Sequence, residues 1–263
     1  MVDAEQRNLI EHMKTWVIQA GQRIEKARES GISYREKTSL RDLVTPIDLE
    51  IENFYRVAIK KVYPTHKILG EEKQGEQAKS LQGSVWIMDP IDGTLNYIKQ
   101  ADNYVTMLSY FKNGVGQVGM IYEVSAKKLL IAIKGKGVFV NGHFIKPIGK
   151  QTCLAQSLMS VEALDLNDAL SLYEFSQKSL GLRITGCAGL DAWQFALGQT
   201  GLYLNHLFPW DNAVSVIMAD LLGFKVTNFK GESLNLLDRE YVVMAYPKIH
   251  EEFLTYVKER FED

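Results

Sequence analysis

Apolar residues recur at a helical period in two segments of the first quarter of the chain. The first segment repeats them every three or four positions, at Leu9, Ile10, Met13, Trp16, Val17, Ala20 and Ile24. The second helical pattern covers about residues 46–62. It predicts a capped start, because Thr45 precedes Pro46 and Asp48 can reach back to the cap in a variant of the capping box. We therefore expect two amphipathic helices at the start of the chain.

The middle of the chain has the pattern of β-strands. Four segments rich in β-branched and aromatic residues cover residues 105–111, 115–122, 129–133 and 138–140. Asn113-Gly114 separates the first two and is a strong hairpin signal, and Asn141-Gly142 marks a turn after the last. These segments predict an antiparallel meander. An earlier apolar run, residues 85–88, predicts a buried strand that ends before Pro90, because proline has no N–H to give to a central ladder.

Beyond Pro147 strands and helices alternate, which is typical of an α/β arrangement. Helices are expected near residues 167–179, 190–198, 211–222 and 250–261. We therefore predict two lobes. Residues 1–146 would form an N-terminal α+β lobe that carries the metal and phosphate loop described below, and residues 147–263 a C-terminal α/β lobe that completes the site.

Composition limits the classes of protein that need consideration. The 263 residues suffice for one large or two closely joined domains, and the formal net charge is −2. Lysine and arginine are scattered, so no nucleic-acid partner is expected. The start of the chain lacks a signal pattern and no apolar run approaches about 18 residues, so we expect a cytoplasmic protein with no membrane partner. Cys153 and Cys187 are too few for a disulfide framework, and burial of Cys187 is favoured over a nucleophilic role.

The stretch after the predicted buried strand reads Asp-Pro-Ile-Asp-Gly-Thr and is the most informative in the chain. The carboxylates of Asp89 and Asp92 and the carbonyl of Ile91 can be aimed at one point, and all are oxygen ligands that Mg²⁺ prefers. Gly93 lets the main chain approach a ligand closely, and a helix that begins near Thr94 would present free N–H groups to an anion. An ordinary turn of this composition is an equally good explanation when the stretch is taken alone.

With Leu95 and Asn96 included, this run resembles the signature of the inositol monophosphatase family of Mg²⁺-dependent, lithium-sensitive phosphatases. Further segments match the family in its order: Lys37, Thr45 to Asp48, Gly70-Glu71-Glu72 and Trp210-Asp211. Each segment also has an ordinary structural explanation, as a solvated acidic loop or a helix cap. Together they span the chain, and the resemblance implies the α+β class, with the layered α-β-α-β-α sandwich of the inositol monophosphatase/fructose-1,6-bisphosphatase type.

The resemblance implies a site for two to three Mg²⁺ ions. Glu71, Asp89 and the Ile91 carbonyl would hold the first ion, Asp89, Asp92 and Asp211 the second, and Glu71 also a weaker third through water. Four crowded carboxylates would repel one another and protonate without such cations. A metal-activated water, oriented by Asp48 and Thr94, would attack phosphorus directly with no phosphoenzyme. Glu71 belongs with Asp48 and Thr94 in the catalytic set, and Lys37 and Glu72 support the site.

The resemblance also implies substrate contacts. Gly93, Thr94 and Asp92 would hold the phosphate side. Ala188 and Asp191 would lie on the alcohol side, although Asp191 could equally cap the following helix. Residues 203–207 lack the acid that binds sugar hydroxyls in animal members, and His206 in this stretch is as readily structural as functional.

A small phosphorylated polyol or nucleotide is therefore the expected substrate, with inositol monophosphate first. NADP(H), fructose 1,6-bisphosphate and 3′-phosphoadenosine 5′-phosphate are related alternatives. The family resemblance also suggests a homodimer. A hypothesis of a different class is a metal-binding regulator of a protein or RNA partner, which is less favoured because every presumed ligand is present.

Overall fold

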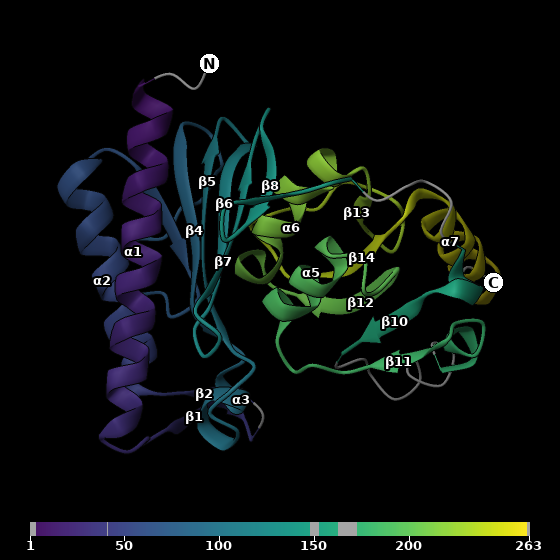
Figure 1. The fold of residues 1–263 in the computed structure, drawn as a ribbon, viewed down its shortest axis with the longest axis horizontal. Helices are drawn as coiled ribbons and strands as arrows, with labels where there is room; N and C mark the ends of the chain where they lie inside the picture. The colour runs from purple at the N-terminus through teal and green to yellow at the C-terminus, as the bar shows by residue number, and fades with distance from the viewer. Residues whose placement is uncertain (1–3, 41, 148–152, 163–172, 262–263) are drawn as a thin grey trace.

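The fold is a stack of five layers in the order α-β-α-β-α, as Figure 1 shows from left to right. The computed structural model describes residues 4–40, 42–147, 153–162 and 173–261. This arrangement confirms the sandwich that the sequence predicts. Within these residues, no helix combines the length and the apolar character that crossing a membrane requires.

The first layer consists of α1 (Ala4–Glu29) and α2 (Pro46–Val62), and both helices were predicted. All seven apolar residues of the first helical pattern are buried. The Thr45 N–H donates to Asp48 Oδ2 at 2.8 Å, which closes the start of α2 as the capping pattern predicted. Between the two helices, β1 (Arg35–Ser39) and β2 (Asp42–Val44) form a small antiparallel pair.

The second layer is a seven-stranded sheet whose strands follow their order in the chain. Its members are β3 (Lys67–Gly70), β4 (Ser84–Asp92), β5 (Val105–Lys112), β6 (Val115–Glu123), β7 (Lys128–Ile133), β8 (Gly137–Val140) and β9 (His143–Ile145). From β4 to β9 every neighbouring pair is antiparallel, which confirms the meander. Asn113 and Gly114 both have positive φ, 51° and 76°, as the tight hairpin turn between β5 and β6 requires.

The prediction that a strand ends before Pro90 is wrong, because β4 continues to Asp92. Its parallel pairing with β3 stops at Met88, opposite Gly70. Its register with β5 shifts between Asp89 and Asp92. Pro90 lies inside this irregularity, where a missing N–H costs no ladder hydrogen bond. The strand therefore delivers both aspartates while it is still part of the sheet.

The remaining layers use the second half of the chain. Helices α5 (Ala188–Ala196) and α6 (Pro209–Leu222) lie between the two sheets, and α7 (Pro247–Phe261) covers the outer face of the second sheet (Figure 1). That sheet has the order β11 (Gly181–Arg183), β10 (Leu158–Val161), β12 (Leu202–Leu207), β14 (Glu240–Ala245), β13 (Lys225–Asn228). Two short helices also occur, α3 (Thr94–Lys99) and η1 (Leu154–Gln156).

Three of the four helices predicted in the second half are confirmed as α5, α6 and α7. Of the fourth, expected near residues 167–179, residues 173–176 are helical, whereas residues 167–172 lie outside the described residues. One apolar cluster joins the inner face of the first sheet to α5, α6 and the second sheet. The boundary between residues 146 and 147 stays a prediction.

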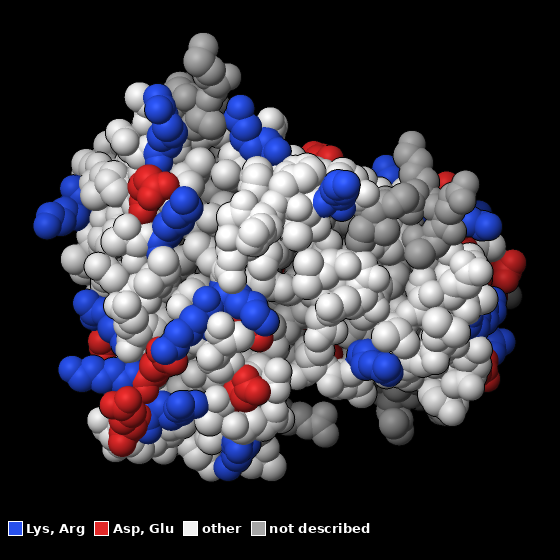
Figure 2. Space-filling model, in the orientation of Figure 1, with Lys and Arg blue, Asp and Glu red and all other residues white. Residues whose placement is uncertain are grey.

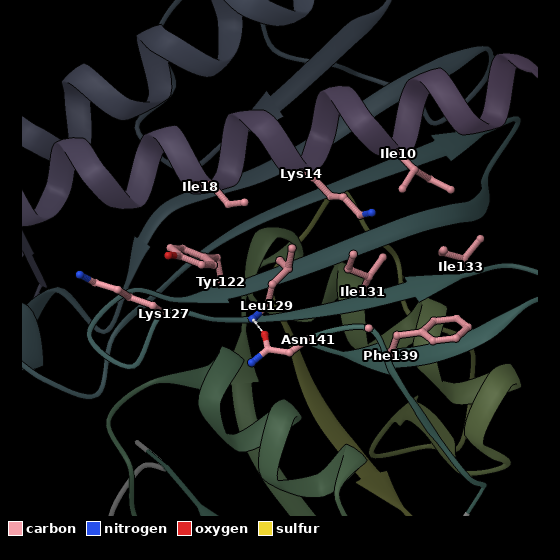
Figure 3. Close-up of a pocket in the computed structure, with 11 residues that line it drawn as sticks. Ile10, Lys14, Ile18, Tyr122, Lys127, Leu129, Ile131, Ile133, Phe139 and Asn141 are labelled. Carbon is pink, nitrogen blue, oxygen red and sulfur yellow. Dashed lines mark hydrogen bonds between the residues drawn. The ribbon is translucent and has the colours of Figure 1, made fainter.

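The outer face of the first sheet is only partly covered. Ile10 and Ile18 of α1 point across a cavity of about 480 Å³ toward Leu129, Ile131 and Phe139 of the sheet (Figure 3). None of the residues that line this cavity is acidic. On the face of the molecule drawn in Figure 2, basic and acidic side chains are interspersed and form no continuous basic stripe. The clustered acids expected from the sequence lie elsewhere, at the ends of β3 and β4 and the start of α6.

Candidate metal and phosphate site

Three aspartates converge where β4 ends and α6 begins. One carboxylate oxygen from each of Asp89, Asp92 and Asp211 lies within 4.8 Å of the other two. Glu71 directly follows β3, and its carboxylate contacts Asp89. Because β3 and β4 are parallel neighbours, their carboxyl ends lie at the same edge of the sheet. The structure therefore brings together all four acids that the sequence selected as metal ligands.

Burial and mutual repulsion make these carboxylates hard to ionise. Burial, followed by the charges of Glu71, Asp92 and Asp211, raises the pKa of Asp89 well above its ordinary value. Burial and the charges of Asp92 and Glu71 likewise raise the pKa of Asp211. For Asp92, burial raises the pKa to about 6, although two backbone N–H groups oppose the shift. A bound cation would reverse the penalty for all of them.

One buried atom indicates which ligand the cluster suits. Asp89 Oδ1 is buried and has no hydrogen-bond partner among the described residues. A buried carboxylate oxygen without a donor is costly, whereas a divalent cation with oxygen ligands would satisfy it. The Ile91 carbonyl accepts a hydrogen bond from Thr94 Oγ1 at 2.9 Å and retains a second lone pair. These residues fit a Mg²⁺ centre.

Asp211 also has the structural role that its position suggested. Its Oδ2 accepts a hydrogen bond from the Phe208 N–H at 2.8 Å, so the side chain caps α6. Trp210, which precedes Asp211 in the family motif, is buried and stacks on Phe208. Capping fixes the carboxylate in the cluster, so the structural and the ligand roles are compatible.

Lys37 and Glu72 flank this cluster of acidic side chains. Lys37 Nζ lies 2.9 Å from Glu71 Oε1 and 2.5 Å from Glu72 Oε1. Burial of Lys37 disfavours its charge, but the two glutamates outweigh burial and raise its pKa. Burial and the charge of Glu71 raise the pKa of Glu72 to about 7. The family resemblance matched Lys37 to a lysine near the metals. The structure places Lys37 beside Glu71 and Glu72, in the turn that follows β3.

The sequence analysis missed Glu52, which holds the Gly70-Glu71-Glu72 turn. Glu52 is fully buried and accepts hydrogen bonds from the backbone N–H groups of Glu72 and Gln74, each at 2.7 Å. A Cβ at Gly70 would lie 2.6 Å from Glu52 Oε2, so only glycine fits above this carboxylate. The available signal was an acid on the apolar face of α2, between Ile51 and Tyr55.

The turn after β4 has the shape of an anion cradle. Gly93 has φ of +83°, and a Cβ there would lie 3.1 Å from both the Asn103 carbonyl oxygen and Cys187 Cβ. Helix α3 begins at Thr94, as predicted. The Thr94 hydroxyl lies 3.5 Å from Asp48 Oδ1. Burial raises the pKa of Asp48 to about 6, against the hydrogen bonds from Thr45.

The start of α5 approaches the cluster from the second half of the chain. The N–H groups of Gly189 and Ala188 donate to Asp92 at 2.5 and 3.2 Å, and Cys187 Sγ lies 3.2 Å from Asp92 Oδ2. Cys187 is buried, as predicted. Asp191 is fully buried and accepts from Ser160 at 2.5 Å and from Thr185 at 2.7 Å. Both Asp191 oxygens therefore have partners inside the protein, which favours its structural role.

A second missed residue, Glu162, lies near Asp92 and Asp191. It follows β10, and its carboxylate accepts hydrogen bonds from the Gly186 N–H and from Asn205 Nδ2, the latter at 3.3 Å. Burial and the charges of Asp191 and Asp92 raise the pKa of Glu162 to about 7. Residues 203–207 lack the expected acid, but this carboxylate reaches Asn205 from another strand. The His206 ring stacks on Tyr241 with centroids 4.2 Å apart, which favours a structural role for His206.

The clustered acids beside the glycine-threonine turn form a candidate site for a metal ion and a phosphate group. The model of the inositol monophosphatase family matches residues 5–262. The chain therefore belongs to this family and is a phosphomonoester hydrolase, which confirms the resemblance seen in its motifs.

Known relatives agree with this assignment. Inositol-1-monophosphatase of Bacillus subtilis is 34% identical over 243 residues, which cover 90% of this chain and 91% of the relative. Fructose-1,6-bisphosphatase/inositol-1-monophosphatase of Thermotoga maritima is 28% identical over 229 residues, 87% of each chain. A solved structure of an inositol monophosphatase/NADP phosphatase with Mg²⁺ and phosphate has a TM-score of 0.89 at 28% identity, with 97% of each chain covered.

Proposed function

We propose that this phosphatase depends on Mg²⁺ and hydrolyses a small phosphorylated polyol, with inositol monophosphate as the first candidate. The observation that carries the proposal is the unpartnered, buried Asp89 oxygen within the three-aspartate cluster, next to the Gly93-Thr94 turn. The named activities of the relatives support it, since they include inositol monophosphate hydrolysis.

We assign two metal positions to this cluster. Glu71, Asp89 and the Ile91 carbonyl would hold one Mg²⁺, and Asp89, Asp92 and Asp211 the other, with Glu71 available to a third ion through water. Mg²⁺ supplies Lewis-acid charge to phosphate oxygens when it is bound. The balance of charge supports at least two ions, because three aspartates converge on one point and Glu71 contacts Asp89.

The protein's own groups supply orientation. The Thr94 hydroxyl lies between the Ile91 carbonyl and Asp48, so Asp48 and Thr94 together can fix the direction of an attacking water. The free N–H groups of Gly93 and Thr94 would hold phosphate oxygens. Burial and the charge of Asp92 raise the pKa of the Cys187 thiol well above its ordinary value, so it stays protonated and is a poor nucleophile. Direct attack by water is therefore the favoured route.

The alcohol side favours hydroxyl groups. Asp92 accepts from the Ala188 N–H, and Glu162 accepts from the Gly186 N–H and from Asn205, close enough to Asp92 for that charge to raise the pKa of Glu162. We propose that Glu162, which is partly exposed whereas Asp191 is fully buried, takes the place of the acid missing from residues 203–207 and accepts hydrogen bonds from substrate hydroxyls. Asp191 would act indirectly, because it accepts a hydrogen bond from the Thr185 hydroxyl and holds that residue in place.

Nucleotide or bisphosphate substrates are the second candidates. The Arg239 guanidinium lies 4.7 Å from the centre of the Phe208 ring, and the charge of Arg239 acts on Asp211. Phe208 is 37% exposed. A cation over an exposed ring at the rim of the site suits a second phosphate or a planar base. NADP(H), fructose 1,6-bisphosphate and 3′-phosphoadenosine 5′-phosphate each carry one of these.

The test is phosphate release across these substrates in Mg²⁺, in chelator and in Mg²⁺ with Li⁺. The proposal expects activity only with Mg²⁺, inhibition by Li⁺, and the highest kcat/KM on inositol monophosphate. Activity that survives the chelator would contradict the metal assignment. The homodimer and the cytoplasmic location stay predictions. Binding of a protein or RNA with no hydrolysis of any phosphomonoester would favour the regulator instead.

A further inference from the structure

Another cavity, of about 600 Å³, lies between α2, β3 and residues 75–80, and several basic residues line it. Arg56 and Lys60 line it from α2, Lys67 from β3, and Lys79 from the loop. None of the four acids of the metal cluster lines this cavity. It is therefore a separate site, with its own chemistry.

The charge in this cavity is positive and largely uncompensated. Lys60 Nζ donates to the carbonyls of Pro64 and His66, and Lys67 Nζ donates to the carbonyl of Gln82. In the part of the chain that the structure describes, no carboxylate pairs with Lys60, Lys67 or Lys79. Glu76 is the one acidic residue that lines the cavity. Three lysines facing one glutamate favour an anionic ligand.

Arg56 gives the cavity a buried donor. Its Nε donates to Glu52 Oε1 at 3.0 Å and its Nη1 to the carbonyl of Glu76 at 3.1 Å. Its Nη2 is buried and has no hydrogen-bond partner among the described residues. An unpaired guanidinium nitrogen in the wall of a basic cavity is a donor that an anion would satisfy with a small shift of the side chain.

The wall of this cavity is connected to the metal ligand Glu71 by two short chains of hydrogen bonds. In the first, Arg56 Nε donates to Glu52 Oε1, and Glu52 Oε2 accepts from the N–H of Glu72. In the second, Gln77 lines the cavity and its Oε1 accepts from the Gly70 N–H at 2.9 Å. Gly70 and Glu72 flank Glu71, so a movement of Arg56 acts on one neighbour of this proposed metal ligand and a movement of Gln77 acts on the other.

We propose that this cavity binds a small polyanion, carrying two or more phosphate, sulfate or carboxylate groups, and that the bound anion changes the affinity of the catalytic cluster for Mg²⁺. Lys60, Lys67 and Lys79 hold the anionic groups. The bound anion approaches Arg56, and the resulting movement of Arg56 acts through Glu52 on the turn that contains Glu71. The coupling rests on the proposed metal role of Glu71, whereas the binding does not.

Binding is tested on metal-stripped protein, prepared over chelating resin because a soluble chelator is itself a polyanion. The probe is inositol hexasulfate, which a phosphatase cannot hydrolyse. Without metal, the catalytic carboxylates repel it, so titration calorimetry reports the basic cavity. We expect Lys60→Gln/Lys67→Gln to weaken binding by roughly tenfold or more, since two charge-assisted hydrogen bonds are lost.

Two further variants make this test decisive. Lys61→Gln changes an exposed neighbour on α2 that does not line the cavity, and it should bind the probe as the wild type does. Lys79→Gln removes an exposed charge with little risk to folding, and it should weaken binding by roughly threefold or more. Failure of the wild type to bind, or equal binding by all variants, would overturn the site.

Coupling is tested by titrating Mg²⁺ into the same protein with and without saturating probe. We expect at least about a twofold change in Mg²⁺ affinity in the wild type and none in the double variant, with the reciprocal change in probe affinity. Probe binding with identical Mg²⁺ affinity would overturn the coupling. Because both readouts are binding constants, an absence of phosphatase activity would contradict the proposed function and leave this inference standing.

Discussion

The N–H of Gly189 donates to Asp92 Oδ2 at 2.5 Å, which joins the first turn of α5 to the end of β4. This hydrogen bond links the two halves of the chain at the cluster of acidic side chains. A Cβ at position 189 would lie 2.6 Å from Val105 Cγ2 and 3.0 Å from Asp92 Oδ2. The main chain of α5 therefore approaches Asp92 only because residue 189 is glycine.

Gly189→Ala should push α5 away from β4 and loosen Asp92. We expect a loss of about 1–3 kcal/mol in the free energy of unfolding, together with a several-fold higher Mg²⁺ requirement for phosphate release. Gly201→Ala is the matched control, because its Cβ would lie 2.5 Å from Ser157 Oγ, away from the cluster. That variant should lose stability and keep its Mg²⁺ requirement. An unchanged Mg²⁺ requirement in both would contradict the role of the Gly189 contact.

The Thr94 hydroxyl can be tested apart from its size. Thr94→Val keeps the shape and removes the group that lies between Ile91 and Asp48, so kcat should fall by roughly hundredfold or more with Mg²⁺ affinity retained. Thr94→Ser restores a hydroxyl and should stay within about tenfold of the wild type. Steady-state kinetics and Mg²⁺ calorimetry measure both. Equal rates for the valine and serine variants would exclude a role for the hydroxyl in orienting water.

The metal-stripped protein should become more stable as the pH falls. Burial raises the pKa of Asp48 and Asp92 to about 6, and the pKa of Glu72 and Glu162 to about 7. In the unfolded chain, carboxyl groups have a pKa of about 4. Between these values the native state binds more protons than the unfolded state, so stability decreases with rising pH. The gain on acidification should begin near pH 7 and be complete near pH 4.

Thermal unfolding from pH 8 to pH 5, with and without Mg²⁺, measures this dependence. Mg²⁺ should raise the Tm most at pH 8, where the cluster is ionised, and progressively less toward pH 5, where protons compete with the ion. A metal-stripped protein that loses stability on acidification from pH 7 to pH 5 would show that these carboxylates are not strained in the folded state.

Glu162 is tested through the substrate. Glu162→Gln should raise the KM for inositol monophosphate by roughly tenfold, because a charged acceptor of hydroxyl hydrogen bonds becomes neutral. Phenyl phosphate has no alcohol hydroxyls beyond the ester, so its KM should change little in the same variant. An equal effect on the two substrates would indicate a structural role for Glu162 alone.

Local patterns in the sequence predicted the helices and the meander well. The bounds expected for the second helix coincide with those of α2, because Thr45, Pro46 and Asp48 mark its start within four residues. Asn113-Gly114 fixed the hairpin in the same local way. The end of β4 was wrong because Pro90 is tolerated only where the β4–β5 register shifts, and that shift depends on a distant strand.

Residues whose role depends on tertiary contacts were missed. Glu52 looks like an ordinary helical acid until Gly70 is placed above it, eighteen positions later. Glu162 reaches Asn205 only because β10 and β12 are parallel neighbours. The four acids of the proposed metal site could be selected because their family motifs are local, whereas the groups that hold them come from different elements.

The central claim is that four carboxylates with Asp89 at their centre form a Mg²⁺ site for hydrolysis. Asp89→Asn removes the charge that both proposed metal positions share and leaves a neutral group where burial penalises a carboxylate. The metal-stripped variant should therefore be at least as stable as the wild type. Asp220→Asn, an exposed aspartate on the same helix as Asp211, is the control.

Phosphate release from inositol monophosphate at saturating Mg²⁺ is the most direct measurement. We predict that Asp89→Asn lowers the rate by at least about a hundredfold, while Asp220→Asn matches the wild type. A folded Asp89→Asn variant that releases phosphate at a near wild-type rate would contradict the metal site itself.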